Sequence, residues 1–386
     1  MDRTILHINI PNFPVALECV RFPRLRGRPV AVAALGGERA TLASVSKVAG
    51  ESGIMAGMPV YRARRMCRDL IVLPVDESYY SSGNARLTSI LMHLSPLVQP
   101  YRFGRAHSDV TRTARTTPRA VDMGWKTLKA IHAELQLAAA AGVGTNKLLS
   151  QIISKVVPAN EVQAITRGNE EKFLAPLWSN YLPSVTGTVW QELQELNLLR
   201  IGEIAQFTAH DLVMIFGKLG GVLFEHAHGI DHTPVMSLDS ARETEIIHGE
   251  VLLPDANDAA ILQTHLLHLV EKASESLRLK KRNTGKLRLE ITFSDGKKAI
   301  GQAVLPAPAF LAHALYPCAK ELLYRLTQRR VRVRTIILAS AKLSPQARQL
   351  DLFSAETVSR AEKLQQAMAR VRERFGEKAV GYLRLN

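Results

Sequence analysis

Residues 287–305 read LRLEITFSDGKKAIGQAVL. The segments Leu287–Phe293 and Ile300–Leu305 place apolar residues in alternation, a pattern typical of strands with one buried face. Asp295-Gly296 lies between them, and Asp-Gly flanked by such segments is a strong signal for a tight β-hairpin. The stretch therefore predicts two antiparallel strands joined by a short turn.

The segments on either side of this hairpin extend it into a module. Ile246–Leu253 reads as a strand and Ala259–Leu279 as a long helix. After the hairpin, Phe310–Leu326 reads as a helix and Val331–Ala339 as a strand. The resulting order, β-α-β-β-α-β, is the split βαβ plan of a small domain of roughly 100 residues.

The rest of the chain is patterned differently. Up to about residue 165, strand and helix patterns alternate, which favours a sheet layered with helices. Residues 169–231 show helical patterns only, and residues 233–242, which include Pro234, show no periodicity and form a linker candidate. The chain has 386 residues. At roughly 100–200 residues per domain, this length agrees with an α+β protein of several domains.

The charge of the chain points to a polyanionic partner. Fifty Lys and Arg against thirty-five Asp and Glu give a formal net charge of +15. Between residues 278 and 334, fourteen basic residues stand against three acidic ones, a field able to hold several phosphates. From this window we predict contacts with DNA phosphates by Lys280, Lys281, Arg282, Lys286, Lys297, Lys298, Arg329, Arg330, Arg332 and Arg334.

Several other classes of protein are not favoured. No apolar run approaches the roughly 18 residues of a membrane-spanning helix, and the first residues do not resemble a signal peptide. We therefore expect a cytoplasmic protein with no membrane partner. Cys19, Cys67 and Cys318 are far apart and form no Cys-x-x-Cys pair, so neither a disulfide framework nor a zinc site is expected.

Two stretches resemble a metal-binding motif and a phosphate-binding loop, respectively, but depart from the spacing of each. His226, His228, Asp231 and His232 form a metal-like cluster. One residue too many separates His228 from Asp231, and the preceding segment is helix-like, so no metal is expected there. The stretch 142–147 reads GVGTNK and lacks the Gly-x-x-x-x-Gly-Lys spacing of a phosphate loop, so it predicts a strand-to-helix turn.

Segments along nearly the whole chain, in the same order, resemble the Y-family translesion DNA polymerases, the group of DNA polymerase IV and ImuB. They are Leu6–Phe13, Ala56–Pro59, Ala141–Leu149 with its Lys147, Gly229–Asp231, the βαββαβ module and Arg360–Gly376. The resemblance implies a right-handed polymerase with a little finger, and Lys147 as a further DNA contact. It implies a palm over residues 1–165 with fingers inserted at about 20–76, a helical thumb over 166–232, a linker over 233–243, a little finger over 244–343 and a tail over 344–386.

The departures from the family pattern concern its catalytic acids. The family uses three carboxylates to hold two magnesium ions, which activate the primer 3′-hydroxyl and neutralise the triphosphate. The matching positions here are Asn9, Gly104 and Arg105. We expect the Arg105 guanidinium to occupy the cation site, paired with Asp109 or a DNA phosphate. Restoring the three acids is expected to restore metal binding without efficient synthesis.

Nucleotide contacts of the family are also replaced. The Tyr-x-x-Arg pair that grips the triphosphate falls at Lys47 and Gly50, and the steric-gate position falls at Pro14. The late palm lysine falls at or near Val157. The resemblance therefore implies that no residue is catalytic, that the nucleotide-binding positions are degenerate, and that no cofactor is needed.

One family motif is intact. Residues 349–353 read QLDLF and match the sliding-clamp pentapeptide Gln-Leu-x-Leu-Phe. Gln349 can hydrogen-bond at the mouth of the clamp pocket, and Leu352 and Phe353 can fill an apolar groove. The clamp-binding residues are expected to be Gln349, Leu350, Asp351, Leu352 and Phe353.

These features predict an ImuB-like, catalytically inactive accessory factor of bacterial translesion synthesis and DNA repair. Its expected partners are damaged primer-template DNA, the sliding clamp, and another polymerase or a recombinase-like accessory protein. The alternative is an active error-prone polymerase that uses magnesium with relocated ligands from among Asp76, Glu77 and Asp109. A third reading is a scaffold that does not bind DNA.

Overall fold

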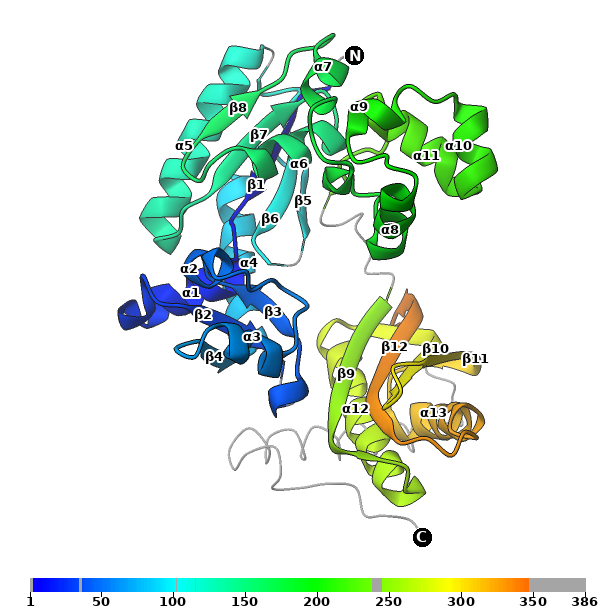
Figure 1. Cartoon of the computed structure of the whole chain (residues 1–386). Helices are drawn as coiled ribbons and strands as arrows, with labels where there is room; N and C mark the ends of the chain where they lie inside the picture. Colours follow the sequence, from blue (N-terminus) through cyan, green and yellow to red (C-terminus); the bar gives the residue numbers. More distant parts are fainter. Residues whose placement is uncertain (1–2, 35–36, 102, 115, 238–244, 347–386) are drawn as a thin grey trace. The chain divides into compact units, whose positions relative to one another are not determined.

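A computed structural model describes residues 3–34, 37–101, 103–114, 116–237 and 245–346 (Figure 1). The chain divides into two compact units, residues 1–242 and 243–386. Within the described ranges, no helix is both long and apolar enough to cross a membrane.

A five-stranded sheet forms the centre of the first unit (Figure 1). Its strands, in spatial order, are β5 (Val98–Tyr101), β6 (Arg105–Asp109), β1 (Ile5–Asn9), β7 (Ala140–Gly144) and β8 (Val162–Ala164). The central strand β1 is antiparallel to both β6 and β7. Because side chains alternate along a strand, Leu6 and Ile8 enter one core while His7 and Asn9 face the other way.

Helices cover both faces of this sheet. The core that contains Leu6 and Ile8 is closed by α4 (Glu77–Met92) and α5 (Thr117–Leu135). On the opposite face, α6 (Lys147–Val156) packs close to β7, since a Cβ at Gly142 would collide with the backbone of α6. This close approach brings α6 down onto the side chains of His7 and Asn9.

A second, three-stranded sheet is inserted between β1 and α4. Its spatial order is β3 (Leu42–Val45), β2 (Val30–Ala33) and β4 (Ile71–Pro74), and it has its own small core. The helices of this region are α1 (Phe13–Arg21), η1 (Pro23–Leu25), η2 (Gly37–Arg39), α2 (Lys47–Glu51) and α3 (Val60–Met66). This layout has the form of palm and fingers.

A cluster of short helices completes the first unit and forms the thumb. Its core is shared with α6 through Leu149, Ile152 and Ile153. Its elements are α7 (Glu170–Leu174), η3 (Ser179–Tyr181), α8 (Gly187–Glu195), α9 (Ile201–Ile204), α10 (Ala209–Phe216) and α11 (Lys218–Ala227).

The second unit is the predicted βαββαβ module. It runs β9 (Glu245–Ala256), α12 (Ala259–Leu279), β10 (Arg282–Phe293), β11 (Lys298–Ala309), α13 (Ala312–Leu326) and β12 (Val333–Pro345). The strands form one antiparallel sheet in the order β11-β10-β12-β9. Leu289 and Ile291 lie in the core with both helices, while Arg288 and Glu290 point to the opposite, open face. The fold class predicted from the sequence is confirmed.

Local capping signals mark the starts of two helices of the first unit. Helix α4 begins at Glu77, where the Asp76 carboxylate accepts a hydrogen bond from the Tyr79 amide at 3.0 Å. Helix α5 begins at Thr117, with a proline in its first turn. The tail and its pentapeptide at residues 349–353 lie outside the described residues, as do residues 238–243 of the predicted linker.

Candidate active site and nucleic-acid interface

The register of β1 and β6 assembles a polar cluster on the palm face beneath α6. Asn9 pairs with Arg105, and His7 pairs with His107. The rings of the two histidines lie 4.3 Å apart, centroid to centroid. The Asn9 amide donates to the Ser154 carbonyl at 3.2 Å. His7 and Asn9 of β1 therefore meet the last turn of α6, and His107 of β6 meets its first residue, Lys147.

Hydrogen bonds fix the tautomers of both histidines. The Ser154 hydroxyl donates to the Gln151 carbonyl, so it accepts from Nδ1 of His7 at 2.6 Å. Nε2 of His107 donates to the Lys147 carbonyl at 3.0 Å, which leaves its buried Nδ1 without a hydrogen-bond partner. Neither ring needs a second proton to complete these bonds.

Burial, together with neighbouring cations, controls the protonation of the titratable groups in this cluster. Burial, followed by the charges of His107, Arg105 and Lys155, holds the pKa of His7 well below its usual range. Burial also lowers the pKa of His107 to about 4, and the charges of Lys147 and Arg105 act in the same direction. Both imidazoles are therefore neutral at pH 7. Burial and the neighbouring Arg105 lower the pKa of Lys155 as well.

The residues of this face do not fit the magnesium ions that the family resemblance implies. Magnesium takes oxygen ligands, preferably carboxylates. Asn9 turns its amide nitrogen toward Ser154, and Arg105 and Lys155 would repel a cation. Across the described ranges, no group of three or more His, Cys, Asp or Glu side chains could hold a metal ion.

Gly104 stands in a turn that leaves little room for a side chain. Phe103 and Gly104 both have left-handed backbone, with φ of 65° and 78°. The Gly104 carbonyl accepts from the Ile10 amide and its amide donates to the Asn84 side chain, both at 2.9 Å. A Cβ here would lie 2.5–2.8 Å from Phe13. The expectation that restoring three acids would restore metal binding stays a prediction, and Asp at position 104 would require Phe13 to move.

Two of the three acids named for the alternative reading, Asp76 and Asp109, have partners outside this cluster. Asp109 lies four residues along β6 from Arg105, about 13 Å at about 3.3 Å per residue, and accepts from the Thr111 amide at 3.0 Å. The predicted Arg105–Asp109 pair is therefore wrong. Asp76 caps α4 and pairs with Arg21 at 3.0 Å.

The degenerate nucleotide positions are spread over two helices. Lys47 and Gly50 are exposed on α2, and Pro14 is buried in the first turn of α1. Lys155 is the lysine that reaches the palm cluster, two residues before the predicted Val157, which is buried. Lys147 donates to the Pro234 carbonyl at 3.4 Å. His7, His107 and Lys155 were not identified from the sequence.

The metal-like histidines of the thumb have local partners. Nδ1 of His226 lies 3.0 Å from the Ser184 hydroxyl. Nδ1 of His228 donates to the Phe224 carbonyl at 2.8 Å. The Asp231 carboxylate accepts from the Leu148 amide at 3.1 Å, at the start of α6. These groups therefore link the thumb internally and to the palm.

The basic window of the second unit divides into two groups at opposite ends of its sheet. Lys280 and Lys281 form the turn before β10 and Arg282 begins that strand. Lys297 lies in the hairpin after β10, and the loop before β12 carries Arg329, Arg330 and Arg332. A strand of 12 residues separates the groups by about 36 Å at about 3.3 Å per residue. Lys286 lies between them on the open face.

Ion pairs neutralise part of this charge. The pairs are Arg329–Asp295 at 3.0 Å, Lys298–Glu290 at 2.8 Å, Arg288–Glu245 at 2.5 Å and Arg334–Asp255 at 3.5 Å. Six of the predicted DNA contacts in this unit form no ion pair with any residue that the structure describes, namely Lys281, Arg282, Lys286, Lys297, Arg330 and Arg332. These cations, which include Lys281 at the first end and Arg330 and Arg332 at the other, remain available for phosphates.

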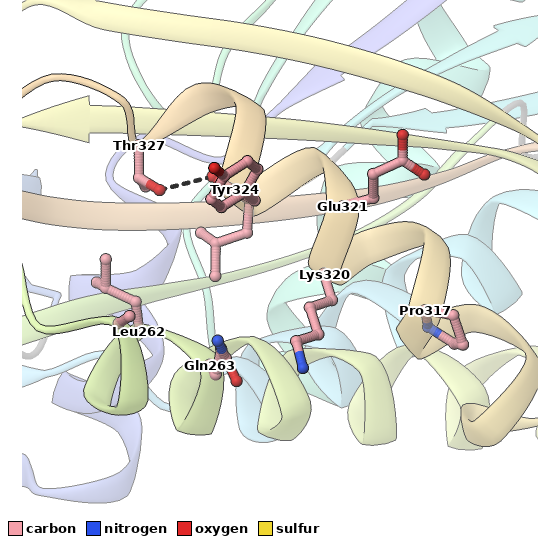
Figure 2. Close-up of a pocket in the computed structure, with 9 residues that line it drawn as sticks. Leu262, Gln263, Pro317, Lys320, Glu321, Tyr324 and Thr327 are labelled. Atoms are coloured by element: carbon pink, nitrogen blue, oxygen red, sulfur yellow. Dashed lines mark hydrogen bonds between the residues drawn. The ribbon is translucent and has the colours of Figure 1, made fainter. Parts of the chain in front are cut away.

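A recess of about 400 Å³ lies between α12 and α13, on the helical side of the module (Figure 2). Figure 2 shows Lys320 extending from α13 toward Gln263 of α12. Tyr324 lines the recess and is 71% exposed. The open face of the sheet, where Lys286 lies, is on the other side of the module, so this recess is separate from the basic surface.

Replacing Gly104 by Ala should destabilise the palm. The left-handed backbone disfavours a side chain, and the new methyl group meets Phe13, so we expect a loss of about 2–4 kcal/mol in the free energy of unfolding. Gly57 also has positive φ, but a Cβ there meets nothing within 4 Å. Urea denaturation should therefore show a smaller loss, about 1–2 kcal/mol, for Gly57→Ala. Equal losses would contradict the clash at Phe13.

Comparison with known proteins agrees with this architecture. Residues 8–155 match the model of the impB/mucB/samB family, and residues 244–352 match the model of its C-terminal domain. DNA polymerase IV of Neisseria meningitidis serogroup B is 30% identical over 278 residues, 70% of this chain and 84% of that protein. DNA polymerase IV 1 of Bacillus subtilis is 27% identical over 382 residues, 98% of this chain and 92% of that protein.

A solved structure gives the same fold. A Y-family DNA polymerase chimera, Dbh-Dpo4-Dbh, superposes with a TM-score of 0.80 at 19% identity and covers 89% of this chain and 99% of its own. Fold, family models and relatives therefore agree. The chain belongs to the impB/mucB/samB family, the Y-family DNA polymerases of the polymerase IV type.

Proposed function

We propose that this protein is a DNA- and clamp-binding accessory factor of translesion synthesis that does not itself transfer nucleotides. The observation that carries the proposal is the palm cluster. This cluster brings Asn9, Arg105 and Lys155 together beneath α6. Asn9, Gly104 and Arg105 are the positions that the resemblance matches to the family's metal-binding acids, and a Cβ at Gly104 would meet Phe13.

The geometry of the second unit supports binding to a DNA duplex. Its two basic groups are separated by the length of β10, about 36 Å. One turn of duplex DNA spans about 34–36 Å, so the two groups can meet phosphates one turn apart. Contacts of this kind position a protein on DNA without reading its sequence.

Clamp docking rests on the sequence of the tail. The QLDLF pentapeptide begins at Gln349, three residues after the last described residue, Gln346. The Gln346 amide donates to the Lys281 carbonyl at 3.1 Å, at one end of the module. The pentapeptide therefore follows directly on a folded domain, as a tethered docking peptide would.

The alternative is an active translesion polymerase, the activity named for the relatives. It requires a metal site built from other acids, such as Asp76, Glu77 or Asp109. Primer extension with magnesium or manganese on damaged and undamaged templates separates the two functions. We expect no templated incorporation above a no-enzyme control, while the same preparation binds primer-template DNA. Appreciable synthesis would reject the accessory role.

DNA binding should depend steeply on salt and on the cations that form no ion pair. The slope of log affinity against log salt should become shallower by about 0.9 for each phosphate that the protein no longer neutralises. We expect Lys281→Gln, Arg330→Gln and Arg332→Gln to weaken binding equally for unrelated sequences, measured by fluorescence anisotropy. Lys126→Gln removes one charge from an exposed position on α5 and serves as the control. A slope unchanged in the triple variant would argue against the basic surface.

Clamp binding should depend on two apolar side chains of the pentapeptide. Leu352 and Phe353 each contribute on the order of 1.5–3 kcal/mol when fully buried. Changing both to Ala should therefore weaken the complex with purified clamp at least about a hundredfold in calorimetry. Asp351→Ala, at the variable position of the motif, should change little. Unchanged affinity in the double variant would remove clamp recruitment from the proposed function.

A further inference from the structure

We propose that Arg105 and Lys155 bind a phosphate group directly, without a divalent metal, on the palm face beneath α6. The site deepens the proposed function and rests on it, since a metal-free palm is the premise. Its ligand class is a phosphate monoester or polyphosphate, from a nucleotide or from the end of a DNA strand.

Two structural links, through Asn9, place the two cations near each other, and their electrostatic effect on each other agrees with this. Arg105 is paired in register with Asn9. The Asn9 amide reaches the carbonyl of Ser154, and Lys155 is the next residue. Arg105 also acts on the charge of Lys155, and both act on His7. Asn9 lies on β1 opposite Arg105 of β6, and its side chain hydrogen-bonds to α6, the helix that carries Lys155.

The site has positive charge without compensation. In the part of the chain that the structure describes, neither Arg105 nor Lys155 forms an ion pair. Both are half-buried, so water screens their repulsion less than it would at an open surface. Like charges held together in this way are stabilised by an anion, which would also raise the pKa of Lys155 and favour its charged form.

Phosphate is the anion that these side chains suit. The planar guanidinium of Arg presents paired donors that match phosphate oxygens, and the Lys ammonium adds a compact charge. Neutral His7 and His107 add no charge at pH 7, so Arg105 and Lys155 supply the attraction. The site therefore replaces two metal cations by two side-chain cations, which hold a phosphate but activate no hydroxyl.

The test uses the full chain in EDTA with three probes, namely a nucleoside triphosphate, a primer-template with a 3′-phosphate, and the same primer-template with a 3′-hydroxyl. We expect the triphosphate to bind, or the 3′-phosphate duplex to bind more tightly than the 3′-hydroxyl duplex, with no gain from added magnesium. The probe whose binding depends on Arg105 and Lys155 identifies the source of the phosphate. Arg105→Gln and Lys155→Gln should each weaken that binding about ten- to a hundredfold.

Thermal unfolding gives a readout that a purely structural role would not produce. Without ligand, either variant should melt at a higher temperature than the natural protein, because one of two like charges is gone. The preferred probe should raise the melting temperature of the natural protein and of Lys126→Gln, but not of Arg105→Gln. Arg105→Lys, which keeps the charge, should recover part of the shift.

Three results would each overturn the site. They are phosphate binding that requires magnesium, binding that both Gln variants leave intact, and absence of binding to every phosphate probe in EDTA. Primer extension on the same preparations shows which of the two proposals fails. If the protein neither binds the phosphate probes nor extends a primer, only the phosphate site is rejected. If it extends a primer in a metal-dependent way, the accessory role is rejected.

Discussion

The pairing of β1 with β6 fixes the chemistry of the palm. A shift of one residue in that register would turn His7 and Asn9 into the apolar core and bring Leu6 and Ile8 beneath α6. Two buried branched side chains in the core make the observed register strongly preferred. The glycine at 142 lets α6 come close enough for Ser154 to meet both His7 and Asn9. The β1–β6 register and the close approach of α6 at Gly142 therefore determine which side chains form the palm cluster.

The same end of the sheet holds the least favourable features of the unit. Arg105 and Lys155 repel each other, the buried Nδ1 of His107 has no hydrogen-bond partner, and Phe103 and Gly104 take left-handed backbone. Strain and unmatched charge collect at functional sites, where surrounding structure holds them in place. Here the surrounding structure is a fully paired sheet with packed helices on both faces, which fixes the cations without balancing their charge.

The sequence predicted the second unit well because its signals are local. The predicted helix Ala259–Leu279 matches α12, since apolar periodicity and an Asp258 cap mark it strongly. Because side chains alternate along a strand, the sequence of β1 would also have placed His7 and Asn9 on the same face of the sheet. Lys155 is different, because its role depends on α6 folding back over a strand almost 150 residues away. The left-handed turn at Gly104 was hidden for a similar reason, since Phe13 and Asn84 shape it from distant segments.

The basic window, residues 278–334, shows that charges close together in the sequence need not form one continuous charged surface. Between residues 278 and 334 the charges form one dense run, yet a strand separates them into two ends, and several are cancelled by Asp295, Glu290, Glu245 and Asp255. The module has its own core, separate from that of the palm. Substitutions around β1 and β6 in the palm therefore leave the packing that positions the basic ends untouched. Because the two cores are separate, the chemistry of the palm cluster and the basic surface of the module can change independently of each other.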